Sequence, residues 1–294
     1  MKLENNSLRI EFHPGLGGKI TSFYQKEKGF ELAAQTDRRY SGLPPAAGGF
    51  GFYAFGMDDA FPNIDAECIE WRGRTLAYPD HGEIWNAEFE VSDQSEDSVS
   101  LCWRSPALDY RYEKRLHLCR NTLQIRYHIT NEGRNELPCL WTWHGLMRYE
   151  EDMKVILPKG ATRFLNVLTG PVLGEAGTVY PLENEVYDFE RVPKAKSRSM
   201  VKFYVEQPVE QGRCGLHYPS QNVTCIMEYD AGKLPYLGCW ITAGGFQGDY
   251  NCALEPANGF YDSISKAGKN DRLLVLAAGE CMEFELNVTL LSFS

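Results

Sequence analysis

The chain has 294 residues, of which 43% are hydrophobic and 24% charged, an ordinary globular composition. Asp and Glu outnumber Lys and Arg by 40 to 30, and no basic run offers the phosphate contacts that nucleic-acid binding needs. The nine cysteines are scattered without a CxxC pair, which favours free thiols over a zinc site.

The N-terminus, MKLENNSLRIEFHPG, contains no apolar segment of the kind found in signal peptides. No apolar stretch approaches the roughly 20 residues needed to span a bilayer. We therefore expect a cytoplasmic protein without a membrane or nucleic-acid partner, and the sequence leaves open whether it is a monomer or a dimer.

Apolar and polar residues alternate with a period of two along much of the chain, which predicts strands. In chain order, the segments with this pattern are 8–12, 87–92, 98–103, 110–118, 122–130, 222–229 and 283–291. Turn residues bound many of them, and no long amphipathic helical pattern is present. We therefore predict an all-β antiparallel sandwich, with residues 1–294 forming a single domain.

Residues 166–199 are rich in Gly, Pro and charge and lack periodicity. The segment predicts a long functional loop that crosses the sheet.

Residues 55–85 are dense in acids and aromatics, including Asp59, Asp80 and His81. Carboxylates accept hydrogen bonds from sugar hydroxyls, and aromatic rings stack on the apolar side of a pyranose. The alternative is an acidic loop whose carboxylates cap its own turns.

The segment LWTWHGLM, residues 140–147, places His144 in an apolar, aromatic strand. Such a histidine is either a hydrogen-bonded core residue or, if it lines a cleft, a general acid, because histidine titrates near neutral pH.

In residues 234–264, Glu255 follows an apolar run and precedes Pro256. A carboxylate at the end of a buried strand is costly unless it is paired or used, although it could also be exposed in a turn. Trp240 is a candidate stacking platform for a sugar, with core packing as the alternative.

Two other kinds of site fit the residues less well. Asp80, His81 and His144 could in principle bind zinc, but they include no compact ligand pair, so we expect no metal. A hydrolase is disfavoured because the chain has no GxSxG motif.

The segments PDHGEIW, LWTWHGLM and CALEPANG, taken in this order and spacing, resemble the aldose 1-epimerase (galactose mutarotase) superfamily. The resemblance runs from Leu8 to the final strand and implies a β-supersandwich fold. It also implies an isomerase that interconverts the α and β anomers of a free aldose without a cofactor. His144 would be the general acid and Glu255 the general base. His81 would bind the sugar, assisted by Asp80 and by residues of the 58–65 loop, which contains Asp59.

The chain departs from that family at one point. Well-studied members carry a substrate-binding arginine in an Asn-Arg-Ile segment upstream of the His-Gly turn, whereas here Asn63 is followed directly by Ile64. The identity of the sugar, including whether it carries phosphate, therefore stays open. A non-catalytic carbohydrate-binding module and another sugar isomerase are alternatives on the same fold.

Overall fold

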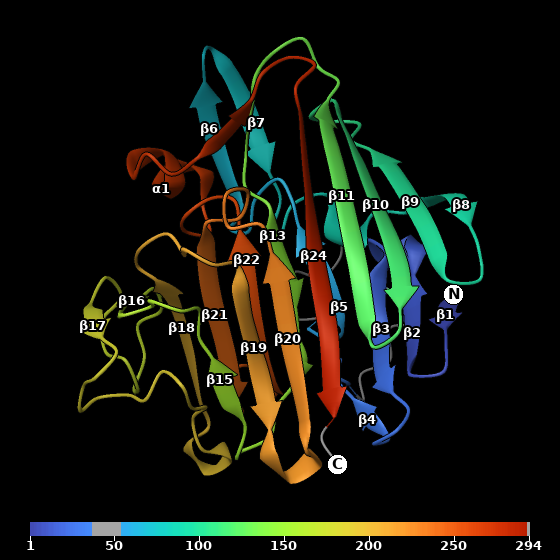
Figure 1. The fold of residues 1–294 in the computed structure, drawn as a ribbon. Helices are drawn as coiled ribbons and strands as arrows, with labels where there is room; N and C mark the ends of the chain where they lie inside the picture. Colours follow the sequence, from blue (N-terminus) through green and yellow to red (C-terminus); the bar gives the residue numbers. More distant parts are fainter. Residues whose placement is uncertain (37–53, 293–294) are drawn as a thin grey trace.

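The computed structural model describes residues 1–36 and 54–292, which form two large antiparallel sheets stacked face to face (Figure 1). Within these residues, the larger sheet has 12 strands. Its path runs through β1 (Lys2–Glu4), β2 (Leu8–His13), β3 (Lys19–Gln25), β5 (Met57–Ala60), β13 (Thr142–Gly145), β22 (Tyr250–Ala257), β21 (Tyr236–Ala243), β18 (Ser199–Val205), β16 (Arg163–Asn166) and β17 (Val179–Pro181), with β4 (Phe30–Glu31) beside β3 and β14 (Met147–Arg148) beside β22.

The second sheet has eight strands in the described part of the chain. Their order is β15 (Lys154–Ile156), β19 (Arg213–Tyr218), β20 (Val223–Tyr229), β24 (Cys281–Ser292), β11 (Thr122–Asn131), β10 (Tyr110–Cys119), β9 (Ser98–Arg104) and β8 (Glu90–Gln94). Two further two-stranded pairs are β6 (Glu67–Trp71) with β7 (Arg74–Tyr78), and β12 (Leu137–Cys139) with β23 (Leu274–Leu276).

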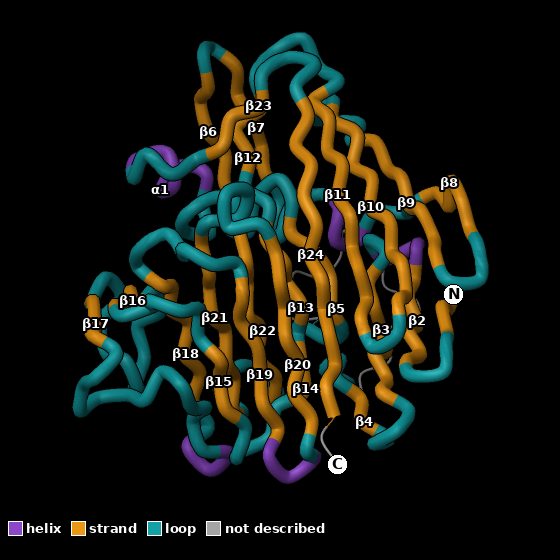
Figure 2. The backbone as a smooth tube through the Cα atoms, viewed as in Figure 1, coloured by secondary structure: helices purple, strands orange, loops and turns teal. Residues whose placement is uncertain are grey.

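Helical structure in the described residues is limited to short segments, drawn in purple in Figure 2. These are α1 (Ile264–Lys269), η1 (Pro14–Leu16), η3 (Ile84–Asn86), η4 (Ala195–Ser197) and η5 (Pro219–Gln221). None of the helices found in the described residues is long and apolar enough to cross a membrane.

The core lies between the two sheets and is rich in aromatic rings. Tyr127 of β11 stacks on Phe284 of β24 at 4.9 Å between centroids, and Trp141 meets Phe284 edge-on at 4.5 Å. Such offset and edge-to-face arrangements add about 0.5–1.5 kcal/mol per pair beyond the burial of apolar surface. The alternating apolar residues predicted for 122–130 supply this core, as their buried positions confirm.

The all-β antiparallel sandwich predicted from periodicity is confirmed, and each predicted segment overlaps a strand. The prediction for residues 166–199 was wrong in its geometry. Part of this segment forms β17, which pairs with β16 at the edge of the larger sheet, and Arg191 bridges to Lys154 of β15 in the other sheet. The segment thus covers a sandwich edge (Figure 1), where stacking of Phe189 on Phe164 at 4.2 Å anchors it.

Candidate active site

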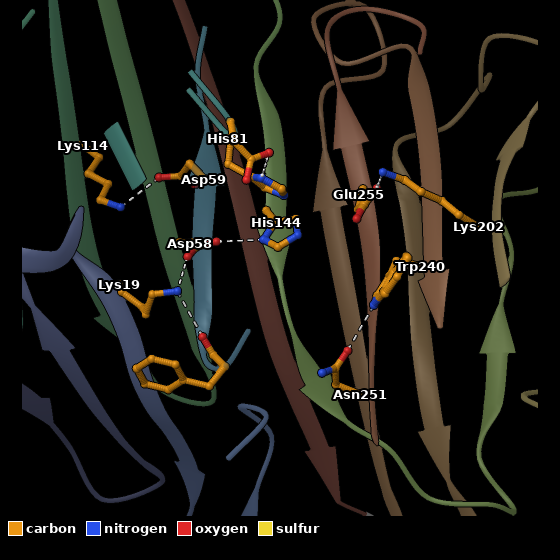
Figure 3. Close-up of polar contacts among 12 residues, drawn as sticks. Lys19, Asp58, Asp59, His81, Lys114, His144, Lys202, Trp240, Asn251 and Glu255 are labelled. Carbon is orange, nitrogen blue, oxygen red and sulfur yellow. Dashed lines mark hydrogen bonds and ion pairs between the residues drawn. The ribbon is translucent and has the colours of Figure 1, made fainter. Parts of the chain in front are cut away.

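Three neighbouring strands of the larger sheet bring an acid, a histidine and a second acid to one face. Asp58 of β5 lies directly opposite His144 of β13. Thr142 of β13 pairs with Ala257 of β22, so continuing the antiparallel register by two residues places His144 beside Glu255. Residues opposite one another on paired strands share a sheet face, and Figure 3 shows the His144 and Glu255 side chains turned toward each other.

The next two strands extend the same face. Gly238 of β21 lies opposite Glu255, and Trp240 of β21 lies opposite Lys202 of β18. A Cβ atom at Gly238 would lie 2.9 Å from Oε2 of Glu255, so the glycine makes room for the carboxylate. The resulting row of functional side chains runs from β5 to β18.

His144 is oriented by a buried carboxylate. Its Nδ1 donates to Oδ1 of Asp58 at 3.0 Å, and Asp58 also forms an ion pair with the buried Lys19. Burial would raise the pKa of the Asp58 carboxyl, but Lys19 and His144 outweigh burial and hold that pKa below its usual value. Asp58 is therefore ionised and only accepts hydrogen bonds, which fixes a proton on Nδ1 of His144 and makes Nε2 the ring nitrogen that faces away from Asp58.

A tight turn places His81 beside His144. The two imidazole rings meet edge-on at 4.9 Å between centroids, and Nδ1 of His81 donates to Oδ1 of Asp80 at 2.9 Å. Gly82 has a φ of +74°, and a Cβ atom there would lie 2.0 Å from the carbonyl oxygen of Phe61, so only glycine fits. Burial lowers the pKa of His81 against the opposing effect of Asp80, which keeps this ring neutral at pH 7.

Glu255 is 1% exposed, and its Oε2 atom is buried without a hydrogen-bond partner. Lys202 is a cation beside this carboxylate: its Nζ lies 3.9 Å from Oε2 of Glu255 and 2.7 Å from Oδ2 of Asp262. Tyr204 donates a hydrogen bond to the other oxygen of Asp262. Burial raises the pKa of Glu255, although Lys202 and His144 oppose the rise.

Trp240 lies on the same face and is partly exposed. Its Nε1 donates to Oδ1 of Asn251 at 3.2 Å, and its ring meets Phe246 edge-on at 5.5 Å. These contacts fix the plane of the indole beside Lys202, as a stacking platform requires.

The structure brings five of the six predicted site residues to this face. Strand register places His144, Glu255 and Trp240 there, His81 meets His144, and Asp80 pairs with His81. The structure does not bring Asp59 to them. Side chains alternate along a strand, so Asp59 points away from its neighbour Asp58 and into the space between the sheets. There its carboxylate accepts hydrogen bonds from Lys114 at 2.8 Å and from Tyr127 at 2.7 Å, so both its oxygens are occupied by contacts within the core.

Sequence reasoning missed three residues of this face: Lys19 and Asp262, which are buried, and Lys202, which is partly exposed. Lys202 has a signal in the sequence, because it alternates with the apolar Val201 and Phe203 and is therefore expected on the opposite side of the strand. Lys19 and Asp262 follow or enter turns and carry no such pattern.

Only one group of three potential metal ligands occurs among the described residues, and it lies on the other sheet. Ligand atoms of His128, Cys281 and Glu283 lie within 4.8 Å of one another. His128 already pairs with Glu283, and neither Cys281 nor Glu283 is buried, so we assign this group no role.

The fold is that of galactose mutarotase-like proteins, as solved structures with similar architecture show. A protein named Slr1438 from Synechocystis sp. PCC 6803 aligns over 100% of this chain and 96% of its own, with a TM-score of 0.79 and 19% identity. A candidate aldose 1-epimerase from Escherichia coli K12 aligns over 99% and 98%, with a TM-score of 0.75 and 20% identity. A galactose mutarotase-like protein from Lactobacillus casei ATCC 334 aligns over 99% of both chains, with a TM-score of 0.73 and 18% identity.

The sequence belongs to the protein family described as a domain of unknown function, DUF4432, whose family model matches residues 94–290. One curated relative is the uncharacterized protein YphB of Escherichia coli strain K12, which is 33% identical over 78 residues. That alignment spans about a quarter of either chain, 26% of each.

Proposed function

We propose that the protein is an aldose 1-epimerase that interconverts the α and β anomers of a free aldose. The observation that carries the proposal is the pairing of His144 with Glu255 on one sheet face, with Asp58 orienting the histidine. A protein that only binds a sugar has no need of an oriented acid facing a buried base. The fold shared with mutarotase-like structures adds support at the level of architecture.

The reaction needs one base and one acid. Glu255 takes the proton from the anomeric hydroxyl while Nε2 of His144 delivers a proton to the ring oxygen, so the C1–O5 bond breaks and a C1 carbonyl forms. Rotation about the C1–C2 bond followed by the reverse proton transfers closes the ring on the other face. Both residues end in their starting protonation states.

Burial suits Glu255 to this task. The raised pKa makes its carboxylate a stronger base than an exposed glutamate. In this proposal the neutral His81, whose ring is held by Asp80, binds a sugar hydroxyl, and Trp240, whose indole is held by Asn251, stacks on the apolar side of the sugar ring.

The test is NMR measurement of anomer exchange on neutral, deoxy, acidic and phosphorylated aldoses with catalytic amounts of protein. We expect faster α/β exchange for at least one class of sugar, abolished by Glu255→Gln and by His144→Ala. Glu113→Gln, which changes a glutamate on the solvent-facing side of the other sheet, is the matched control. Chemical-shift changes on sugar binding without any acceleration would instead identify a non-catalytic carbohydrate-binding module. A constitutional isomer as product would identify a sugar isomerase.

A further inference from the structure

A largely covered lysine, Lys202, lies behind the proposed base. Lys202 projects from β18 toward Glu255 of β22, and Gly238 on the intervening strand has no side chain to separate them (Figure 3). Its Nζ lies 3.9 Å from Oε2 of Glu255, which is too long for a hydrogen bond but close enough for strong charge–charge attraction in a buried site.

A second set of contacts holds Lys202 in place. Oδ2 of Asp262 accepts from its Nζ at 2.7 Å, and Tyr204 donates to the other oxygen of Asp262. The lysine side chain is 15% exposed and that of Asp262 9% exposed. The ammonium group therefore has a fixed position, whereas a lysine on the surface would sample many.

Oε2 of Glu255 is the oxygen that faces this ammonium. It is buried, has no hydrogen-bond donor, and would lie 2.9 Å from a Cβ atom at position 238. When the ammonium of Lys202 attracts Oε2, the Glu255 carboxylate has a fixed orientation, and its second oxygen, Oε1, points in a defined direction.

We propose that Lys202 is the positioning residue for the base: anchored by Asp262, its ammonium holds Oε2 of Glu255 inward and leaves Oε1 to accept the proton of the anomeric hydroxyl. This inference rests on the proposed function. Lys202 transfers no proton itself and acts only through Glu255.

The charged and titratable groups around Glu255 show what the lysine contributes. Lys202 from β18 and His144 from β13 favour its ionised form, whereas Asp262 and burial disfavour it. Tyr204 and Cys239 also interact with this carboxylate; burial raises the pKa of each well above its usual value, and both stay neutral. Removing the charge of Lys202 leaves His144 alone to oppose burial, so Glu255 would take up a proton at higher pH.

The experiment measures two quantities in wild type, Lys202→Met and Lys202→Arg: the pH profile of anomer exchange, and the NMR titration of the Glu255 carboxyl carbon. Glu255→Gln assigns the carbon resonance. Lys26→Met is the control, because Lys26 also pairs with a glutamate, Glu4 at 2.7 Å, but lies on the surface.

We expect Lys202→Met to move the acidic limb and the carboxyl titration upward together, by about 1 on the pH scale for the loss of an opposite charge at this distance. Lys202→Arg keeps the charge, so its pH profile and carboxyl titration should stay closer to those of wild type. Lys26→Met should give the wild-type pH profile and titration. A lysine with a merely structural role would lower the rate equally at every pH.

Each outcome is decisive. If the Glu255 titration does not move in Lys202→Met, the positioning role is wrong even if the wild type catalyses anomer exchange. If the wild type accelerates no sugar while the titration still moves, the proposed function falls and the coupling of Lys202 to Glu255 stands.

Discussion

Asp58 and Asp59 are neighbours on β5, and each forms a buried ion pair with a lysine from another strand. Asp59 points between the sheets, where Lys114 and Tyr127 satisfy both its oxygens. Asp58 points to the opposite face, where one oxygen binds Lys19 and the other accepts from His144.

The two clusters differ in the residue that joins each aspartate–lysine pair, which is Tyr127 for Asp59 and His144 for Asp58. Tyr127 is buried with a pKa well above its usual value, so it stays a neutral hydrogen-bond donor to Asp59. The corresponding partner of Asp58 is His144, the proposed general acid. A buried ion pair thus stabilises the core on one side of the strand and orients the proposed general acid on the other.

The largest expected effect is on the core pair. Asp59→Ala leaves the Lys114 charge buried without its carboxylate, so the free energy of unfolding should fall by about 3–5 kcal/mol. Urea denaturation measures this. The double variant Asp59→Leu with Lys114→Met removes both charges and should recover most of the loss, and a double variant as unstable as Asp59→Ala would contradict this account.

The site pair should show its effect in catalysis. Asp58→Asn keeps the shape of the side chain but removes the charge that orients His144, so kcat for anomer exchange should fall by about 100-fold or more. Asp97→Asn is the matched control, because Asp97 lies 3.6 Å from His117 in an exposed pair. Wild-type rates in Asp58→Asn would show that His144 needs no carboxylate partner.

Glu255 differs from both aspartates, because its Oε2 atom accepts no hydrogen bond, whereas both oxygens of Asp58 and of Asp59 have partners. The raised pKa of Glu255 means that the folded protein binds this proton more tightly than the unfolded chain does, so the ionised carboxylate costs stability as pH rises through that pKa. Glu255→Gln should therefore raise the free energy of unfolding at pH 7 by about 1 kcal/mol while abolishing exchange. A loss of stability in urea denaturation would mean that the carboxylate is better compensated than its contacts indicate.

The pH dependence of kcat/KM for anomer exchange distinguishes the ionisation of Glu255 from that of Asp58. A base must be ionised, so activity falls with decreasing pH through the Glu255 pKa, which burial places above the ordinary value for glutamate, about 4.3. Asp58, whose pKa is held low, stays ionised throughout this limb. An acidic limb of kcat/KM at or below pH 4.3 would assign it to a different group.

Much of this architecture follows from local patterns. The alternation in 122–130 and 283–291 predicts strands with one apolar face, and both are central strands with those residues buried. The His-Gly turn before Trp85 and the segment that carries His144 were recognised by their resemblance to a known family and not by periodicity. The structure shows a positive φ at both His81 and Gly82 in that turn.

The edge segment was harder to predict, because its order comes from contacts with distant residues. Phe189 is held by stacking on Phe164 and by an edge-on contact with Phe203, and no short sequence pattern predicts these contacts. A stretch rich in Gly, Pro and charge therefore has the composition of a loop even though part of it pairs as a strand.

The sequence by itself determined strands such as 122–130, where apolar and polar residues alternate with period two, but it placed Asp58 and Asp59 in an acidic loop. The structure put both aspartates on β5, where neighbouring side chains point to opposite sides. Only the tertiary structure decided which side is the core, because that depends on where the second sheet packs. It also brought Lys19 to Asp58 and Lys202 to Glu255, pairs separated by many residues along the chain. Strand pairing through backbone hydrogen bonds made these neighbours, and burial between and beside the strands gave their charges the strength to act on one another.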